Sequence, residues 1–279
     1  MKRAAARDSV EAATLAAVDA GSEARAAPNR DTARARAAER PRLTSKIVPV
    51  RDLDPRLHDE MWAVFSRYYE GVTRESFEKD LAPKDHVILL FDAERGSVQG
   101  FSTLQVTVTE VRGRRVVSLF SGDTIVDAAY WGQNALQKAF YRYIVRTKFA
   151  HPFTPVYWFL ISKGYKTYLL LSRNYRVYWP RHDRPTPAWE TAVLDRLAGE
   201  RFGDDWRPEL GIIRFSQCNT RLHAGVAPVD AEILAYPDIR FFVERNPGHC
   251  DGDELACLGL IDFRLFISWP LKLARRAAA

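Results

Sequence analysis

One stretch of the chain, residues 116–136, brings together residue types that could bind an anion. It reads VVSLFSGDTIVDAAYWGQNAL: an apolar strand, an aspartate turn, and then Gly132 and Gln133, which open a helix. The first N–H groups of a helix have no partner within the helix, and the helix dipole adds positive charge at the same place. Such a helix start binds anions, above all phosphate. The sequence therefore predicts a phosphate site after this strand.

The composition predicts a globular protein. The chain has 279 residues, of which 47% are hydrophobic and 12% aromatic, enough to bury a large core. The net charge is +6, but much of the excess lies in residues 1–44 and in Lys272, Arg275 and Arg276. Because the remainder is close to neutral, we expect no nucleic-acid groove.

The cysteines predict neither a disulfide framework nor a metal site. Cys218, Cys250 and Cys257 are an odd number, widely spaced and without a CxxC pair. Metal ligation by His249 with the last two cysteines is a weaker alternative, because a fourth ligand is missing. A reducing compartment fits this usage, and we expect a cytoplasmic protein.

The N-terminal residues 1–44 have the opposite character. They contain 15 alanines and no aromatic residue. Such a segment cannot bury enough apolar surface to offset the entropy of ordering, so we expect a disordered tail. Its Arg and Ala content is typical of a transit peptide, but six acidic residues argue against that interpretation.

The elements that must position the anion site follow from the hydrophobic periodicity. Asp54 and Pro55 begin an amphipathic helix, and Arg112-Gly113-Arg114 forms a hairpin turn between two strands. After the hairpin the period changes from that of strands to that of a helix. We expect strands at 45–50, 86–91, 98–108, 115–126 and 156–161, and helices from 55, at 74–81, at 132–149 and at 164–172.

This order of elements resembles the GNAT superfamily, the acyl-CoA N-acyltransferase fold, over about residues 46–178. The family signature after the fourth strand reads roughly V-x-P-x-Y-R-G-x-G-x-G/A, and Val126, Tyr130 and Gly132 agree with it. The resemblance implies an α/β (α+β) fold with a mixed central sheet, in which an antiparallel meander precedes a βαβα unit. We expect an acyltransferase-like core at 45–180 and an α/β extension, packed on it, at 181–279.

The resemblance also implies a cofactor. In the family, backbone amides of this turn bind the pyrophosphate of coenzyme A or the phosphopantetheine arm of an acyl carrier protein. These contacts come from the main chain, so they tolerate side-chain changes. The matching cofactor-binding residues are Val126, Trp131, Gly132, Gln133, Asn134, Ala135 and Leu136.

Three residues are candidates for catalysis. Asp123 lies where the resemblance implies that the central strand splays to admit a thioester, and it is the candidate general base. Ser121 is a candidate oxyanion donor. Either residue could instead satisfy a local bulge or turn. The family places a tyrosine acid where this chain has Leu170, so Tyr168 would need a register shift to serve.

The C-terminal part is predicted from its apolar runs. Pro187 begins a helix that extends to about residue 202, and residues 239–243 are predicted as a strand before a turn. Residues 255–273 are strongly apolar, but Asp262, Arg264 and Pro270 argue against a transmembrane span. Packing against the protein's own core is the preferred interpretation. A peripheral membrane contact through 255–276 is the alternative.

The sequence thus predicts an acyltransferase that moves an acyl group from an acyl thioester to an amine. Coenzyme A or an acyl carrier protein would carry the acyl group, and no metal is required. The alternative is a non-catalytic module that keeps this fold for ligand binding or protein interaction, with a membrane surface as one location.

Overall fold

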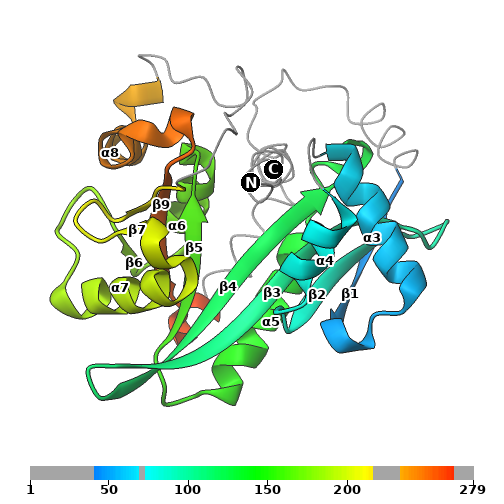
Figure 1. Ribbon diagram of the computed structural model, residues 1–279, viewed down its shortest axis with the longest axis horizontal. Coiled ribbons are helices and arrows are strands. Elements are labelled where there is room, and N and C mark those ends of the chain that lie inside the picture. Colours follow the sequence, from blue (N-terminus) through cyan, green and yellow to red (C-terminus); the bar gives the residue numbers. More distant parts are fainter. Residues whose placement is uncertain (1–40, 69–72, 216–232, 267–279) are drawn as a thin grey trace.

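The computed structural model describes residues 41–68, 73–215 and 233–266, so the predicted tail up to residue 40 lies outside the described residues. Within these ranges nine strands form one sheet in the order β1-β2-β3-β4-β5-β9-β8-β7, with β6 beside β9. The strands are β1 (Leu43–Pro49), β2 (His86–Asp92), β3 (Val98–Val111), β4 (Arg114–Val126), β5 (Val156–Ser162), β6 (Tyr178–Trp179), β7 (Trp206–Arg207), β8 (Ile212–Ile213) and β9 (Glu254–Leu260). The α-helices are α3 (Pro55–Tyr68), α4 (Arg74–Leu81), α5 (Ala135–Ala150), α6 (Tyr165–Asn174), α7 (Ala188–Phe202) and α8 (Pro237–Arg245) (Figure 1).

The first half of the sheet is an antiparallel meander of β1 to β4. Along β2, Val87 and Leu89 join the core cluster of α3 and α4, whereas Ile88 and Leu90 join the cluster of α5. This alternation follows from the two-residue period of a strand. The meander is therefore buried on both faces, with α3 and α4 on one side and α5 on the other.

The local signals of this half act as predicted. The Asp54 carboxylate accepts a 2.8 Å hydrogen bond from the N–H of Leu57, which caps α3. At the hairpin between β3 and β4, Arg112 and Gly113 have φ values of 48° and 76°. Two consecutive positive φ angles are typical of a two-residue hairpin turn. The turn lets β3 and β4 pair from residue 100 to residue 126.

The second half begins with β5, which runs parallel to β4 and continues into α6. The helix α7 packs on the α4 side of the sheet, where Val193 and Leu197 contact a cluster that includes Phe120 and Phe159. The sequence of meander, helix, parallel strand and helix confirms the predicted GNAT-like fold. The segment predicted as an extension supplies β7, β8 and β9 to the same sheet.

One prediction in the C-terminal part is wrong. Residues 239–243 lie in helix α8, because Pro237 starts the helix and Ile239 and Phe242 are buried on one side of it. Residues 255–260, for which the sequence predicted an apolar run and no element type, lie in strand β9, between β5 and β8. The side chains of Leu255, Cys257 and Leu258 are buried in the core. The remainder of the proposed membrane contact, from 267 to 276, lies outside the described residues.

In the described ranges, 41–68, 73–215 and 233–266, no helix is long and apolar enough to cross a membrane. In the same ranges no group of three or more His, Cys, Asp or Glu residues is arranged to hold a metal ion. Cys250 is exposed and Cys257 is buried, and both are free thiols. Cys218 lies outside the described residues.

Candidate active site

The central feature of the candidate site is a gap between β4 and β5. The two strands pair only from Val117 and Val156 to Phe120 and Phe159. Beyond that point β4 continues to Val126 beside β3 alone, and β5 continues to Ser162 beside β9 alone. Figure 1 shows the two strands diverging toward their carboxyl ends. We call this gap the slot.

The loop that leaves β4, residues 127–131, is fixed by hydrogen bonds within the protein. Asp127 accepts from the Ala129 N–H at 3.1 Å and forms a 2.9 Å ion pair with Arg67. The Tyr68 hydroxyl accepts from the Ala128 N–H at 2.8 Å. Tyr130 donates its hydroxyl hydrogen to Asp92. These bonds use the amides at the start of the loop and hold its shape.

Burial explains why Tyr130 remains a donor. Burial of the phenol, together with the adjacent Asp92 carboxylate, raises the pKa of Tyr130 to about 12. The bond from Tyr130 and two backbone N–H groups lower the pKa of Asp92. The pair is therefore a protonated tyrosine on an ionised aspartate near neutral pH. It anchors the loop and does not titrate in the physiological range.

The amides that follow this loop have no acceptor within the described part of the chain. They are the N–H groups of residues 132–136, which we call the amide row. The helix α5 begins at Ala135, three residues later than predicted, with Asn134 as an N-cap whose side chain makes no capping bond. Its first turn contains no acidic residue. Gly132, at φ 86°, makes the left-handed bend at which the row begins.

The helix dipole adds to this row of donors. An α5 of 16 residues carries partial positive charge at its first turn, where the amides are bare. In the second turn Phe140 contacts Trp158 of β5 edge-on, with ring centroids 5.3 Å apart. This contact brings α5 against the strand on the other side of the slot. The arrangement suits a diphosphate at the helix start and an extended arm leading to the slot.

The other predicted cofactor residues use their side chains on the protein itself. The Gln133 side chain accepts from the Leu43 N–H at 2.9 Å and donates to the Pro41 carbonyl at 2.8 Å. The Trp131 indole N–H donates to the Val126 carbonyl at 2.8 Å. The side chains of Gln133 and Trp131 are therefore engaged within the protein, and the main-chain groups of this region remain for an anion, as the resemblance implies. Their role in cofactor binding stays a prediction.

Ser121 lies at the base of the slot. Its hydroxyl accepts a 3.0 Å hydrogen bond from the Trp158 indole N–H, a contact between β4 and β5 just beyond their last paired residues. A hydroxyl that accepts one bond keeps its own hydrogen for another acceptor. Asp123 follows on the same strand and is half-buried. Between them, the register of β3 and β4 shifts, which is the bulge that the sequence left open.

Tyr168 occupies a different environment. It is fully buried, and its hydroxyl donates a 3.0 Å bond to the Pro180 carbonyl. Its ring lies among Tyr178, Phe241 and Phe242, with centroids 5.9–6.2 Å apart. Burial raises the pKa of this phenol far above its usual range. The structure thus brings Ser121 and Asp123 together at the slot, while the Tyr168 hydroxyl is bound on the α8 side.

Sequence reasoning missed two cations near the slot. The Lys84 Nζ lies 5.5 Å from the centroid of the Phe120 ring, and the Arg201 Cζ lies 3.6 Å from the same centroid. Arg201 also donates to the Gln105 side chain at 2.7 Å. Lys84 comes from the loop after α4 and Arg201 from the end of α7. No spacing in the sequence signals that these distant residues meet on one aromatic ring.

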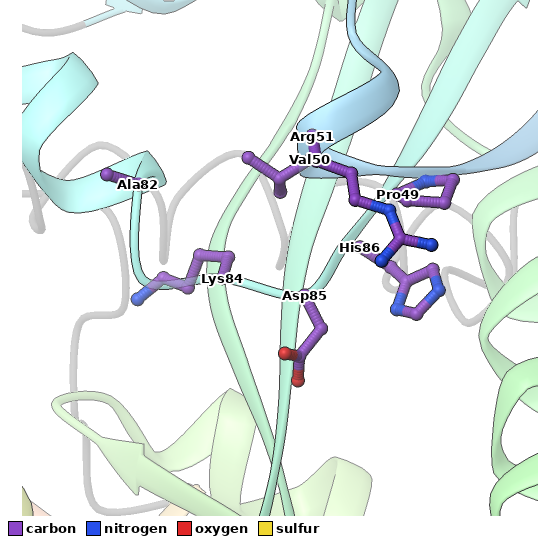
Figure 2. A pocket seen from close by; sticks show the side chains of 7 residues that line it. All are labelled: Pro49, Val50, Arg51, Ala82, Lys84, Asp85 and His86. Atoms are coloured by element: carbon purple, nitrogen blue, oxygen red, sulfur yellow. The ribbon is translucent and has the colours of Figure 1, made fainter.

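A separate pocket of about 340 Å³ lies where β1 ends and β2 begins. Figure 2 shows Arg51 and His86 next to each other in it, with Lys84 extending away from them. The Asp85 carboxylate accepts from the Val106 N–H, and His86 Nδ1 is 3.0 Å from the Tyr143 hydroxyl. Burial lowers the pKa of His86 below its ordinary value. None of the predicted site residues lines this pocket.

Comparisons with known proteins give distant structural matches that cover only part of the chain. No protein-family model and no curated protein sequence matches the chain. Among solved structures, a conserved protein of unknown function from Enterococcus faecalis V583, described as a "Probable N-Acyltransferase", is 16% identical with a TM-score of 0.36, over 57% of this chain and 44% of that one. A GNAT family N-acetyltransferase from Escherichia coli in complex with CoA is 17% identical with a TM-score of 0.32, over 44% and 65%.

A third match covers nearly the whole length of the matched protein. An acetyltransferase from Trypanosoma brucei is 19% identical with a TM-score of 0.31, and the match covers 52% of this chain and 98% of that one. By contrast, the match to the Enterococcus protein covers less than half of that protein's length. The order and pairing of its own elements describe a divergent GNAT-like fold.

Proposed function

We propose that this protein transfers an acyl group from an acyl thioester, carried by coenzyme A or an acyl carrier protein, to an amine. One observation carries the proposal: the β4–β5 slot opens beside the amide row at the start of α5. A diphosphate on the row would leave the pantetheine arm to run into the slot and deliver the thioester carbonyl beside Ser121.

The reaction then needs three groups. Asp123 accepts a proton from the attacking amine, which makes the nitrogen nucleophilic. The nitrogen attacks the thioester carbonyl, and the Ser121 hydroxyl donates to the oxygen as it becomes negative. Collapse of the intermediate forms the amide and releases the thiolate, which takes up a proton. The family would assign that last proton to a tyrosine, and Tyr168 stays a prediction for this role.

A titration with acyl thioesters tests donor binding. Acetyl, medium-chain and long-chain acyl-CoA, and an acylated carrier protein, are added while the melting temperature is recorded. We expect a concentration-dependent rise with at least one donor, because a ligand that binds only the folded state stabilises it. If none of these donors shifts the melting temperature, the proposal is wrong.

Asn134 offers a sharper test of where the donor binds. Asn134→Asp keeps the size and the capping preference of this exposed residue but adds a negative charge beside the amide row. We expect the affinity for acyl-CoA to fall at least about tenfold while the stability stays the same or rises by about 0.3–1 kcal/mol. Asn134→Ser is the matched control, because it caps the helix without a charge. If both variants bind acyl-CoA with equal affinity, the donor does not bind at this helix start.

Asp123→Asn separates chemistry from binding. The variant keeps the shape of the side chain but no longer accepts a proton, so turnover with an amine should be lost while acyl-CoA still binds. If turnover is unchanged in this variant, Asp123 is not the general base. Intact binding by both the parent and the variant, without turnover by either, would favour the non-catalytic ligand-binding module.

A further inference from the structure

Three phenylalanine side chains gather in solvent at the carboxyl end of α5. Phe149 is the last but one residue of the helix and is 62% exposed, and Phe153, in the loop that follows, is 99% exposed. Phe263, three residues beyond β9, is 46% exposed, and its ring meets the Phe149 ring edge-on with centroids 5.6 Å apart. Every other phenylalanine of the chain is buried or half-buried. We call these three residues the aromatic patch.

The loop that carries Phe153 is held in place by a buried cation. Lys148 is only 7% exposed, and its Nζ donates to three carbonyl oxygens of this loop at 3.0–3.4 Å. The acceptors belong to His151, Pro152 and Thr154. The same Nζ lies 5.3 Å from the centroid of the Phe263 ring, so one side chain joins the loop to the rest of the patch. The fold thus fixes the loop while its most apolar side chain stays in water.

Packing does not explain this arrangement. A side chain that is 99% exposed buries almost no surface, so Phe153 contributes little to the stability of the fold. An exposed cluster of large apolar side chains is typical of a surface that binds something else. The aromatic patch is therefore a candidate interaction surface.

The charges around the aromatic patch indicate what it binds. Arg146 lies one turn before Phe149 on the same face of α5, and Arg264 follows Phe263, and both arginines are exposed. The chain has no acidic residue between positions 127 and 183, a range that includes all of α5 and the loop after it. Near Phe263 the carboxylate of Asp262 accepts a 3.0 Å hydrogen bond from the Leu265 N–H. Cations thus flank the exposed rings.

We infer that the aromatic patch binds the surface of an anionic membrane. Phe153 enters the layer below the lipid headgroups, and Arg146 and Arg264 meet the headgroup phosphates. A protruding ring needs a matching pocket in a protein partner, whereas the fluid interior of a bilayer accepts it without one. The sequence of residues 267–279 adds three cations, a tryptophan and no acidic residue, a composition that suits the same surface. This inference does not rest on the proposed function.

Membrane contact at this place leaves the candidate active site open. The patch is at the carboxyl end of α5, and the amide row is at its amino end. A helix of 16 residues separates the two by about 24 Å. A molecule bound to a membrane through the patch therefore still presents the amide row to a ligand from solution.

Vesicle flotation with the full chain tests the inference. One set of vesicles contains phosphatidylcholine alone, and the other contains phosphatidylcholine with phosphatidylglycerol, which is anionic. We expect the protein to float with the anionic vesicles and to bind the neutral ones at least about tenfold more weakly. Added salt should weaken the binding, because it screens the attraction to the headgroups. A protein that stays unbound with the anionic vesicles, or binds both sets equally, overturns the inference.

A serine variant locates the apolar contact. Phe153→Ser should lower the partition coefficient for anionic vesicles at least about tenfold, because the transfer of one phenyl ring out of water is lost. Its melting temperature should match that of the parent, since the ring buries almost nothing in the fold. Tyr236→Ser, at an exposed aromatic residue beside the start of α8, is the control. Figure 1 shows α8 at the top of the molecule and the carboxyl end of α5 at the bottom. Equal binding by the two variants would contradict the inference.

Charge variants locate the headgroup contact. Arg146→Gln and Arg264→Gln should each weaken binding to anionic vesicles about fivefold. Arg240→Gln, at an exposed arginine of α8, is the matched control and should bind like the parent. If all three variants bind equally, the cations beside the patch do not meet the membrane and the inference is wrong.

Sedimentation velocity distinguishes the membrane from a second copy of this chain. If the patch joins two copies, the parent sediments as a dimer, Phe153→Ser sediments as a monomer, and the vesicles stay free of protein. That set of results overturns the inference. A parent that binds anionic vesicles and sediments as the same species as Phe153→Ser in their absence supports it.

Discussion

The two sides of the slot are built differently. On the β4–α5 side, Ser121 keeps a hydroxyl hydrogen and the amide row has no acceptor in the described structure. On the β5–α6 side two pairs of polar groups are bound within the protein: Tyr168 donates to Pro180, and Lys163 lies 3.9 Å from Glu254 with both side chains buried. The first side offers groups to a ligand, whereas the second uses them to hold the sheet together.

This contrast has a chemical meaning. A donor that binds through main-chain amides survives changes of side chain, so the anion site can persist where the family signature has been lost. A proton route depends on one side chain in one register, and in this chain the expected position holds Leu170. In the proposed function, the reacting groups of the slot therefore come mainly from the β4–α5 side.

The largest effect is expected on the structural side. Lys163→Met leaves Glu254 with a buried charge from which its cation has been removed, and we expect a loss of about 3–5 kcal/mol in the free energy of unfolding. Urea denaturation measures it. The double variant Lys163→Met with Glu254→Leu should recover most of the loss, because no charge is then left buried. A single variant as stable as the parent would contradict the scaffold role of this side.

The next effect tests the ligand-facing side. Ser121→Ala removes the hydroxyl at the base of the slot, and we expect kcat to fall about 100-fold with the affinity for acyl-CoA unchanged. Steady-state kinetics and a donor titration measure the two quantities. Ser118→Ala, a buried serine on the opposite face of β4, is the control and should retain kcat. A normal kcat in Ser121→Ala would show that Ser121 does not act as an oxyanion donor and serves only to bind Trp158.

A smaller effect is expected at Tyr168. Tyr168→Phe removes the bond to the Pro180 carbonyl, so we expect about 1 kcal/mol less stability and a kcat changed by less than about twofold. Thermal denaturation and steady-state kinetics check both values. If this tyrosine protonates the thiolate after all, kcat will fall about 100-fold or more, and the contrast between the two sides disappears.

The smallest effect concerns pH and lies outside the slot. Burial lowers the pKa of His86 below its ordinary value of 6.5, with neighbouring Arg51 and Arg146 acting in the same direction and Asp85 and Asp52 opposing it. The unfolded chain therefore binds this proton more readily, and stability should fall as the pH drops from about 7 to about 5. Melting temperatures of the parent and of His86→Asn measure this difference. A variant with the same pH slope as the parent would exclude His86 as a source.

The sequence predicted the parts of the fold that depend on local signals. The Asp54 cap, the Arg112-Gly113 turn and the alternation in β2 are each set by neighbouring residues. The prediction of a strand at 239–243 was wrong because a short apolar run fits a helix or a strand equally well, and Pro237 decides for the helix. The strand β9 was not predicted, because its pairing with β5 joins residues about a hundred positions apart.

The candidate site also has a part that local sequence signals predict and a part that depends on contacts between distant residues. The amide row was predicted because a strand followed by a helix start is a local pattern. The bond between Ser121 and Trp158 spans 37 residues, and Lys84 and Arg201, which both approach the Phe120 ring, come from the loop after α4 and from the end of α7. Contacts of this kind depend on how α7 packs on the sheet, which no spacing in the sequence encodes.

The Gln133 side chain, which is hydrogen-bonded to the backbone of Pro41 and Leu43, offers a way to measure ligand occupancy of the site. It joins the amide row to the first residue of β1, 90 positions earlier in the chain. By thermodynamic linkage, a ligand that fixes the loop also disfavours local opening at the start of β1. The Leu43 amide is then a built-in reporter, and its deuterium exchange would slow in proportion to occupancy of a site that it does not touch.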